Sequence, residues 1–172
     1  MRIAHLTNVA DLIQVMEGAP RCGYHQGMED LENAGPEDQE AVAALLEGCG
    51  LPHEDIAPHL GHFTLARSGG RLVGVIGLEV HGHDGLLRSL AVAEEHRGEG
   101  IARRLYASLL GRARGLGVER LFLLTTNANG FFEMLGFRVV ERQDVPEAIR
   151  GTEEFRMLCP RTATCMARTV SH

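Results

Sequence analysis

The stretch that decides the fold is LAVAEEHRGEGIARRLYASLL, residues 90–110. A short apolar segment ends in charged residues, and an amphipathic pattern begins at once, with Ile101, Leu105 and Leu109 at intervals of four. This pattern is typical of a strand that runs directly into a helix. The junction between the two therefore sets both the topology and any site built on it.

Arg97, Gly98 and Gly100 occupy that junction. The first N–H groups of a helix have no intrahelical partner and carry the positive end of the helix dipole, so they favour an anion. Glycine lets the backbone approach that anion closely, and Arg97 adds a positive charge. A diphosphate fits such a site, and a merely structural tight connection is the alternative. The Rossmann and Walker patterns do not fit, because position 103 is Arg and no GK[ST] follows.

Composition indicates one globular domain. The chain has 172 residues, of which 44% are hydrophobic and 23% charged, and these values exclude disordered and fibrous classes. A net charge of −6 argues against nucleic acid as a partner. No apolar run reaches the roughly 18 residues of a membrane helix, and no secretory signal is visible, so no membrane partner and a cytoplasmic location are expected. The four scattered cysteines suggest free thiols.

The order of elements predicts a mixed sheet. Residues 1–27 are expected to form an N-terminal helix and linker, and residues 28–172 the main domain. A helix begins near Pro36 and ends at Gly48 or Gly50. Beyond it, the patterns predict three strands joined by turns in 62–92, the helix from 101, a buried strand in 118–126, a short helix in 128–137, and further strands in 138–142 and 162–170.

Two motifs resemble those of the GNAT acetyltransferases. RSLAVAEEHRGEGIARRLYASLL is similar to the family's [R/Q]xxGx[G/A] signature, with Arg97, Gly100 and Ala102 in the defining places. TTNANGFFEMLGF resembles the next motif, a short helix that ends in Gly136 and Phe137. The resemblance implies an α+β fold of three layers (α/β/α), with a mixed, mostly antiparallel sheet splayed between its fourth and fifth strands.

The resemblance also implies acetyl-CoA as co-substrate. Its diphosphate would bind the N–H groups that follow Arg97, its pantetheine would pair along the fourth strand, and a backbone N–H near Leu90 or Ala91 would polarise the thioester carbonyl. The cofactor-binding residues implied in this way are Leu90, Ala91, Val92, Arg97, Gly98, Glu99, Gly100, Ile101, Ala102, Arg103, Asn127 and Phe132.

The implied function is N-acetyl transfer to the amine of a small molecule. GLEV, LLRSLAV and EFRMLCPRTATCM are together similar to GNAT proteins of arsenic-resistance operons, whose relatives acetylate amino-acid-like toxins. An amino acid or a toxic analogue is therefore the expected acceptor. Phe132 stands where the family commonly has a tyrosine acid, which leaves a catalytically weak acyl-CoA-binding or regulatory module as the alternative. A homodimer is left open.

Glu79 and Arg88 are the candidates for acid–base chemistry and substrate binding. Glu79 lies in a strand beside an apolar run, where partial desolvation would raise its pKa and suit it to act as the base; a solvated charge is the alternative. Arg88 interrupts the apolar LLRSL, where an unpartnered charge is costly. Its partner is either a carboxylate of the substrate or Glu79.

Thr125, Thr126 and Asn127 end the predicted fifth strand at the mouth of the splay. The two threonines are candidates for substrate binding, and Asn127 either contacts the cofactor or caps the next helix. Cys159 and Cys165 could bind a thiophilic metalloid, but two thiols without a third ligand favour inert buried cysteines. The histidines lack partners at metal-ligand spacing, so no metal is predicted.

Overall fold

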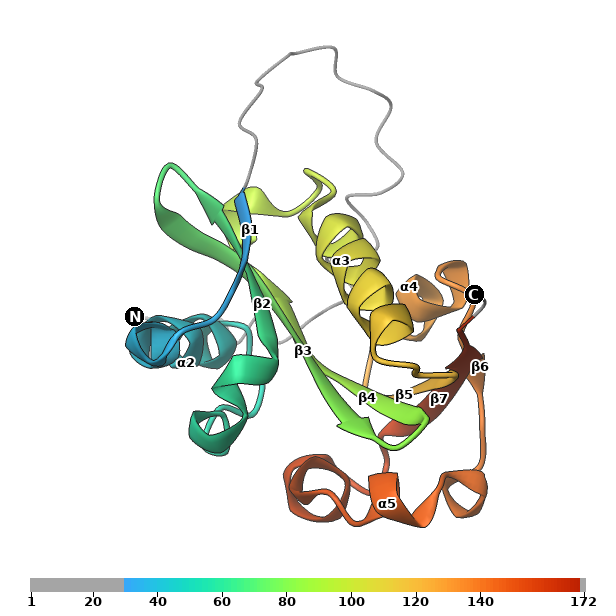
Figure 1. Cartoon of the computed structure of the whole chain (residues 1–172). Helices are drawn as coiled ribbons and strands as arrows, with labels where there is room; N and C mark the ends of the chain where they lie inside the picture. Colours follow the sequence, from blue (N-terminus) through green and yellow to red (C-terminus); the bar gives the residue numbers. More distant parts are fainter. Residues whose placement is uncertain (1–29, 171–172) are drawn as a thin grey trace.

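The structure is a computed structural model that describes residues 30–170; the predicted helix and linker at 1–27 lie outside the described residues. Seven strands form one sheet in the order β1-β2-β3-β4-β5-β7-β6 (Figure 1). The strands are β1 (Asp30–Asn33), β2 (Phe63–Ser68), β3 (Arg71–His81), β4 (Asp84–Val92), β5 (Arg120–Thr125), β6 (Arg138–Val139) and β7 (Thr164–Thr169).

The helices predicted near Pro36, from residue 101 and in 128–137 are present. The α-helices are α2 (Gln39–Gly48), α3 (Ile101–Gly115), α4 (Asn129–Met134) and α5 (Glu147–Arg150). Short 3-10 turns are η1 (Pro36–Asp38), η2 (Ala57–His62), η3 (Glu94–His96) and η4 (Arg142–Asp144), and η5 (Glu154–Leu158) is a π-helical turn. No helix within 30–170 is long and apolar enough to cross a membrane.

The predicted mixed sheet is confirmed. Strands β1 to β4 form an antiparallel meander, and β5, β7 and β6 also pair antiparallel. Among the described strands, only β4 and β5 pair in parallel, and their pairing spans just Asp84–Arg120 to Leu86–Phe122. Beyond Leu86 the two strands separate, so the sheet is splayed where the resemblance places the splay.

A bulge in β4 marks the start of that separation. Gly77 of β3 faces Arg88, whereas Val75, two residues earlier, faces Ala91, so β4 holds one extra residue. Ser89 within this bulge has a φ of 55°, which non-glycine residues seldom adopt. A bulge leaves one residue outside the ladder and bends its strand. Here it turns β4 away from β5.

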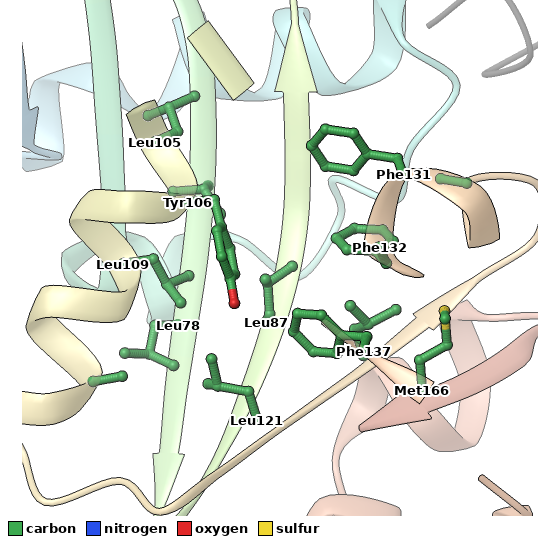
Figure 2. Close-up of a cluster of buried hydrophobic side chains, with 14 of the residues drawn as sticks. Leu78, Leu87, Leu105, Tyr106, Leu109, Leu121, Phe131, Phe132, Phe137 and Met166 are labelled. Atoms are coloured by element: carbon green, nitrogen blue, oxygen red, sulfur yellow. The ribbon is translucent and has the colours of Figure 1, made fainter. Parts of the chain in front are cut away.

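Helices cover both faces of the sheet, in agreement with the predicted three layers. Helices α3 and α4 share one apolar core with β3, β4, β5 and β7; Figure 2 shows Leu105, Tyr106 and Leu109 on one side of it and the phenylalanines 131, 132 and 137 on the other. On the opposite face, α2 packs on β2 and β3 through Val42 and Leu46, while α5 and η5 pack on β4 and β5 through Ile149 and Phe155. These two smaller cores are separate clusters, which leaves room between them.

Candidate functional site

A cavity of about 800 Å³ opens where β4 and β5 separate. The diverging strands supply two of its walls, the loop after α2 a third and η5 with the following residues a fourth. The lining residues are 49–54, 87–92, 123–128 and 157–160, together with Glu47, Arg97, Ala102, Phe131, Phe132, Glu154 and Ala163.

The glycine turn predicted from the sequence lies at one end of this cavity. Gly98 and Gly100 have φ values of 82° and 81°, a region that only glycine adopts readily. Backbone hydrogen bonds stop at Arg97 N to Glu94 O (3.2 Å) and resume at Arg104 N to Gly100 O (3.1 Å). Within the described residues, the amides of 98–103 therefore have no recorded protein acceptor and are open to an anion.

Arg97 is held beside this turn. Its Nε donates to the carbonyl oxygen of Val92 at 3.2 Å, and its Nη2 lies 3.9 Å from the Sγ of Cys49. The side chain thus bridges the end of β4 and the loop after α2, and it faces the cavity. A positive charge is fixed next to the open amides.

The predicted cofactor residues divide into two groups. Those that line the cavity are Leu90, Ala91, Val92, Arg97, Ala102, Asn127 and Phe132. Those that form the adjoining turn and first helical residues without lining it are Gly98, Glu99, Gly100, Ile101 and Arg103. Ile101 is 1% exposed and its side chain belongs to the α3 core, so any contact from it to a ligand must come through its backbone.

The polar end of β5 differs in detail from expectation. Thr125 and Thr126 line the cavity, but Thr125 Oγ1 also accepts a hydrogen bond from the N–H of Ala128 at 3.0 Å. Thr125 therefore closes the turn before α4, which was one of the two roles considered for Asn127. No side-chain cap is recorded at the start of α4, and Asn127 is exposed.

Arg88 is the centre of a buried ion cluster. Strand alternation puts it on the sheet face opposite Leu87 and α3. Its Nη1 donates to Glu79 Oε1 at 2.6 Å and its Nη2 to Asp55 Oδ1 at 2.7 Å. Its Nε lies 2.9 Å from Glu154 Oε2. Of the two partners considered from the sequence, the structure contains the pair with Glu79, and it adds two carboxylates that the sequence did not indicate.

The cluster holds more acid than base. All four side chains are at least nine-tenths buried, and three carboxylates share one guanidinium. Burial raises the pKa of Glu154 to about 7; the charge of Arg88 opposes this, and the charges of Glu79 and Asp55 add to it. Burial alone would lower the pKa of Arg88, but its carboxylate partners outweigh burial and hold that pKa above its usual range. Arg88 therefore stays charged, and Glu154 changes protonation near neutral pH.

Glu79 lies deeper than the sequence suggested. It is 5% exposed and does not belong to the residues that line the cavity. His59 Nδ1 is 3.8 Å from Glu79 Oε1, and His81 Nε2 is 3.6 Å from Glu79 Oε2. Glu79 reaches the cavity through Arg88, and its other side faces the two histidines.

Asp55 and Glu154 are the members of the cluster that sequence reasoning missed. Asp55 lies in the loop between α2 and η2, and Glu154 begins η5 and the stretch EFRMLCPRTATCM, in which the sequence pattern indicated no role for this glutamate. The charge of Arg88 in an apolar strand was a sign that buried acids must exist. It did not say which ones, because both come from irregular segments far away in the sequence.

The aromatic residues contribute packing. Phe132 is 6% exposed and packs edge-on against Phe131 and Phe137, with ring centroids 5.3 and 5.6 Å apart. The Tyr106 hydroxyl accepts a hydrogen bond from Arg168 Nη1 at 2.7 Å, and burial raises the pKa of this phenol. Tyr106 belongs to the α3 core, in line with a packing role (Figure 2).

The remaining cysteines and histidines form no metal site among residues 30–170, where no suitable group of three ligands occurs. Cys159 lines the cavity, and Cys165 is buried in the core beneath α5. Burial, followed by the charge of Glu154, raises the pKa of Cys159 to about 12. This residue is therefore a neutral thiol at ordinary pH.

A splayed sheet, a glycine turn with open amides and a cavity between them form one unit. The profile of the acetyltransferase (GNAT) family matches residues 25–137, which is more than half of the chain. The chain belongs to this family. This membership, together with the splayed mixed sheet, confirms the predicted fold class.

This GNAT chain is similar in sequence to several acetyltransferases. An uncharacterized N-acetyltransferase of Chlorobaculum tepidum is 30% identical over 127 residues, which are 69% of this chain and 81% of that protein. An amino-acid acetyltransferase of Neisseria meningitidis is 31% identical over 99 residues, 56% of this chain. The matched part is 23% of the Neisseria protein, so this GNAT chain corresponds to one portion of that longer enzyme.

This GNAT chain is also similar in structure to a solved acetyltransferase. N-acetylglutamate synthase from Neisseria gonorrhoeae, in complex with coenzyme A and L-arginine, superposes with a TM-score of 0.74 at 26% identity. The superposition covers 86% of this GNAT chain and 34% of the synthase. The two share the acetyltransferase fold, and the synthase structure contains coenzyme A.

Proposed function

We propose that the chain transfers the acetyl group of acetyl-CoA to the amino group of a small molecule, either an amino acid or a toxic amino-acid analogue. The observation that carries this proposal is the cavity at the splay. It brings open amides, the free edge of β4 and a buried ion cluster to one space. Similarity to the amino-acid acetyltransferase and to the N-acetylglutamate synthase supports an amino-acid acceptor.

The donor would bind across the splay. In this arrangement the diphosphate accepts hydrogen bonds from amides 98–103 next to Arg97, and the pantetheine follows residues 90–92 along the exposed edge of β4. The thioester then lies near the β4 bulge, where a backbone N–H outside the ladder can polarise its carbonyl. No side chain needs to supply this donor.

The acceptor would bind at the opposite side of the cavity, between Arg88 and the end of β5. Arg88 already pairs with three carboxylates, so we assign it mainly to holding these acids in place. The excess negative charge next to it favours the ammonium end of the acceptor. Thr125 and Thr126 offer hydroxyl groups to the rest of the molecule.

The test is release of free thiol from acetyl-CoA in the presence of an amine panel. The panel contains glutamate and other amino acids, phosphinothricin as the toxic analogue, and a polyamine. We expect at least one small amine to raise CoA release above the hydrolytic background, with the acetylated amine identified by mass. Preference for phosphinothricin over common amino acids would support the detoxifying variant of the proposal.

A second candidate function is acyl-CoA binding without efficient transfer, which Phe132 favours because a phenyl ring cannot protonate the leaving thiolate. Tight acetyl-CoA binding with no thiol release for any amine would support it.

The variant Gly100→Val tests the proposed donor site. Because φ is 81° at Gly100, a branched side chain is strained there, and we expect it to raise the KM for acetyl-CoA. An unchanged KM would contradict the placement of the diphosphate.

A further inference from the structure

Three carboxylates hold Arg88, and they differ in where they lie. Glu154 is among the residues that line the cavity, whereas Asp55 and Glu79 are not. Glu154 is 7% exposed, and its Oε2 atom accepts no hydrogen bond within the described residues, although Arg88 Nε lies 2.9 Å away. A buried carboxylate oxygen with spare acceptor capacity therefore lies at the wall of the cavity.

An unusual local structure puts Glu154 there. It begins η5, in which the N–H of Cys159 donates to the carbonyl of Glu154 at 3.0 Å, five residues apart. Such π-helical turns are rare and often occur at functional sites. The Thr152 hydroxyl fixes the start of the turn, since it donates to Ile149 O at 2.8 Å and accepts from Phe155 N–H at 3.3 Å. The backbone thus fixes the position of the carboxylate.

We propose that Glu154 receives the acceptor's ammonium group and takes its proton, which makes it the catalytic base of this enzyme; the inference rests on the proposed function. Glu79, the base expected from the sequence, then acts as a positioning residue. It fixes Arg88 from the far side, and Arg88 in turn fixes Glu154.

The reaction balances with these groups. The ionised Glu154 takes one proton from the ammonium, and the neutral amine attacks the thioester carbon. The C–N bond forms, the C–S bond breaks, and the electron pair leaves on the thiolate of CoA. The nitrogen loses its second proton as the thiolate gains one. Glu154 returns its proton to solvent, so one proton is released for each amide formed.

The location of Glu79 argues against direct contact with an amine. Arg88 lies between Glu79 and the cavity, and the carboxylate of Glu79 also has His59 and His81 within 3.8 Å. A proton moving from the cavity to Glu79 would have to pass a guanidinium that is already charged. Glu154 requires no such transfer.

Electrostatics support the assignment. The charged and titratable groups that face Glu154 are Arg88 from β4, Glu79 from β3, Asp55 from the loop before η2, and the Cys159 thiol. Burial and the two carboxylates outweigh Arg88 and raise the pKa of Glu154 to about 7. A base with that pKa is half ionised at neutral pH, where proton transfer is most effective.

The decisive experiment is the pH dependence of kcat/KM for the amine that the panel identifies. For the wild type we expect kcat/KM to rise tenfold per pH unit at acidic pH and to level off near pH 7; this rising part of the profile is its acidic limb. Glu154→Gln should remove this limb and lower the plateau about 10²–10⁴-fold, with the KM for acetyl-CoA unchanged. Asp55→Asn and Glu79→Gln are matched controls, because both remove a partner of Arg88. Each should keep the limb but move it to lower pH, since each removes a negative charge that raises the pKa of Glu154. A limb that survives Glu154→Gln, or that Glu79→Gln alone abolishes, overturns the inference.

Two further measurements separate this inference from folding and from the proposed function. Glu154→Asp should retain the limb at a reduced rate, and CoA affinity should show that each variant is folded. If no amine is acetylated, the proposed function fails. The infrared band of protonated carboxyl groups, taken as the difference between wild type and Glu154→Gln, still tests the assignment of Glu154 as the base. If this band disappears at the pH where an ordinary glutamate ionises, the assignment is refuted.

Discussion

The two faces of the sheet bury different kinds of side chain, although the same strands form both. Towards α3 and α4, β3 and β4 present Ile76, Leu78 and Leu87 to one continuous apolar core; Figure 2 shows the two leucines in it. Towards α2 and α5, the same strands present Glu79 and Arg88 between two smaller apolar cores. Burial of a large apolar side chain contributes roughly 1.5–3 kcal/mol, whereas a buried charge stabilises only while its partners remain. One face supplies stability, and the other holds charge where chemistry requires it.

Among the variants that test this difference between the two faces, Arg88→Met should have the largest effect on stability. The variant keeps the volume but leaves three carboxylates buried without a cation, which should cost about 3–5 kcal/mol of unfolding free energy near neutral pH. Denaturant unfolding measures it, and the loss should shrink in acid as the carboxylates become protonated. Arg120→Met is the control, because Arg120 is half exposed and its pair with Asp84 should contribute about 1 kcal/mol or less. Equal effects at the two sites would show that the charged face is not special.

A smaller effect concerns stability against pH. Because the pKa of Glu154 is raised from 4.5 to about 7, the folded protein holds a proton that the unfolded chain releases over this range. The associated stability is fully present below pH 4.5 and is lost as the pH rises through about 7, by roughly 3 kcal/mol. Glu154→Gln should flatten this part of the curve, whereas Glu153→Gln, an exposed neighbour, should leave it unchanged. A wild-type slope in Glu154→Gln would contradict the raised pKa.

The smallest effect belongs to the apolar face. Tyr106→Phe removes the hydroxyl that accepts a hydrogen bond from Arg168, and we expect a loss of about 0.5–1.5 kcal/mol in thermal or denaturant unfolding. The kcat for the amine should not change, since Tyr106 lies within the α3 core. A large fall in kcat would instead indicate that Tyr106 donates a proton to the thiolate, and that the apolar face also contributes a catalytic residue.

The sequence predicted the regular part of the molecule well. The period of Ile101, Leu105 and Leu109 predicted the helix, and the glycines at 98 and 100 predicted the turn before it. The structure has this helix and this turn, with η3 inserted between β4 and the turn. These features are local, because one residue type at one spacing determines each of them. The same holds for the turns of the meander, where Gly69, Gly70 and Gly82 have positive φ values.

The candidate site was predicted only in part. Arg88 was noticed because a charge in an apolar strand requires a partner. Asp55 comes from a loop and Glu154 from the π-helical turn η5, and the positions of both depend on the packing of Ile56 and Phe155. The bulge at Ser89 was also invisible, since serine carries no preference for a positive φ. Long-range packing, and not local pattern, determines these features.

The short parallel contact between β4 and β5 has one more consequence. Among the described strands, the ladder between the meander and the C-terminal strands consists of three residue pairs. A donor molecule lying in the gap would add links between the two halves of the sheet where the chain itself supplies none. The co-substrate would then stabilise the sheet at the splay, so that binding of the donor and tightening of the sheet would be one event.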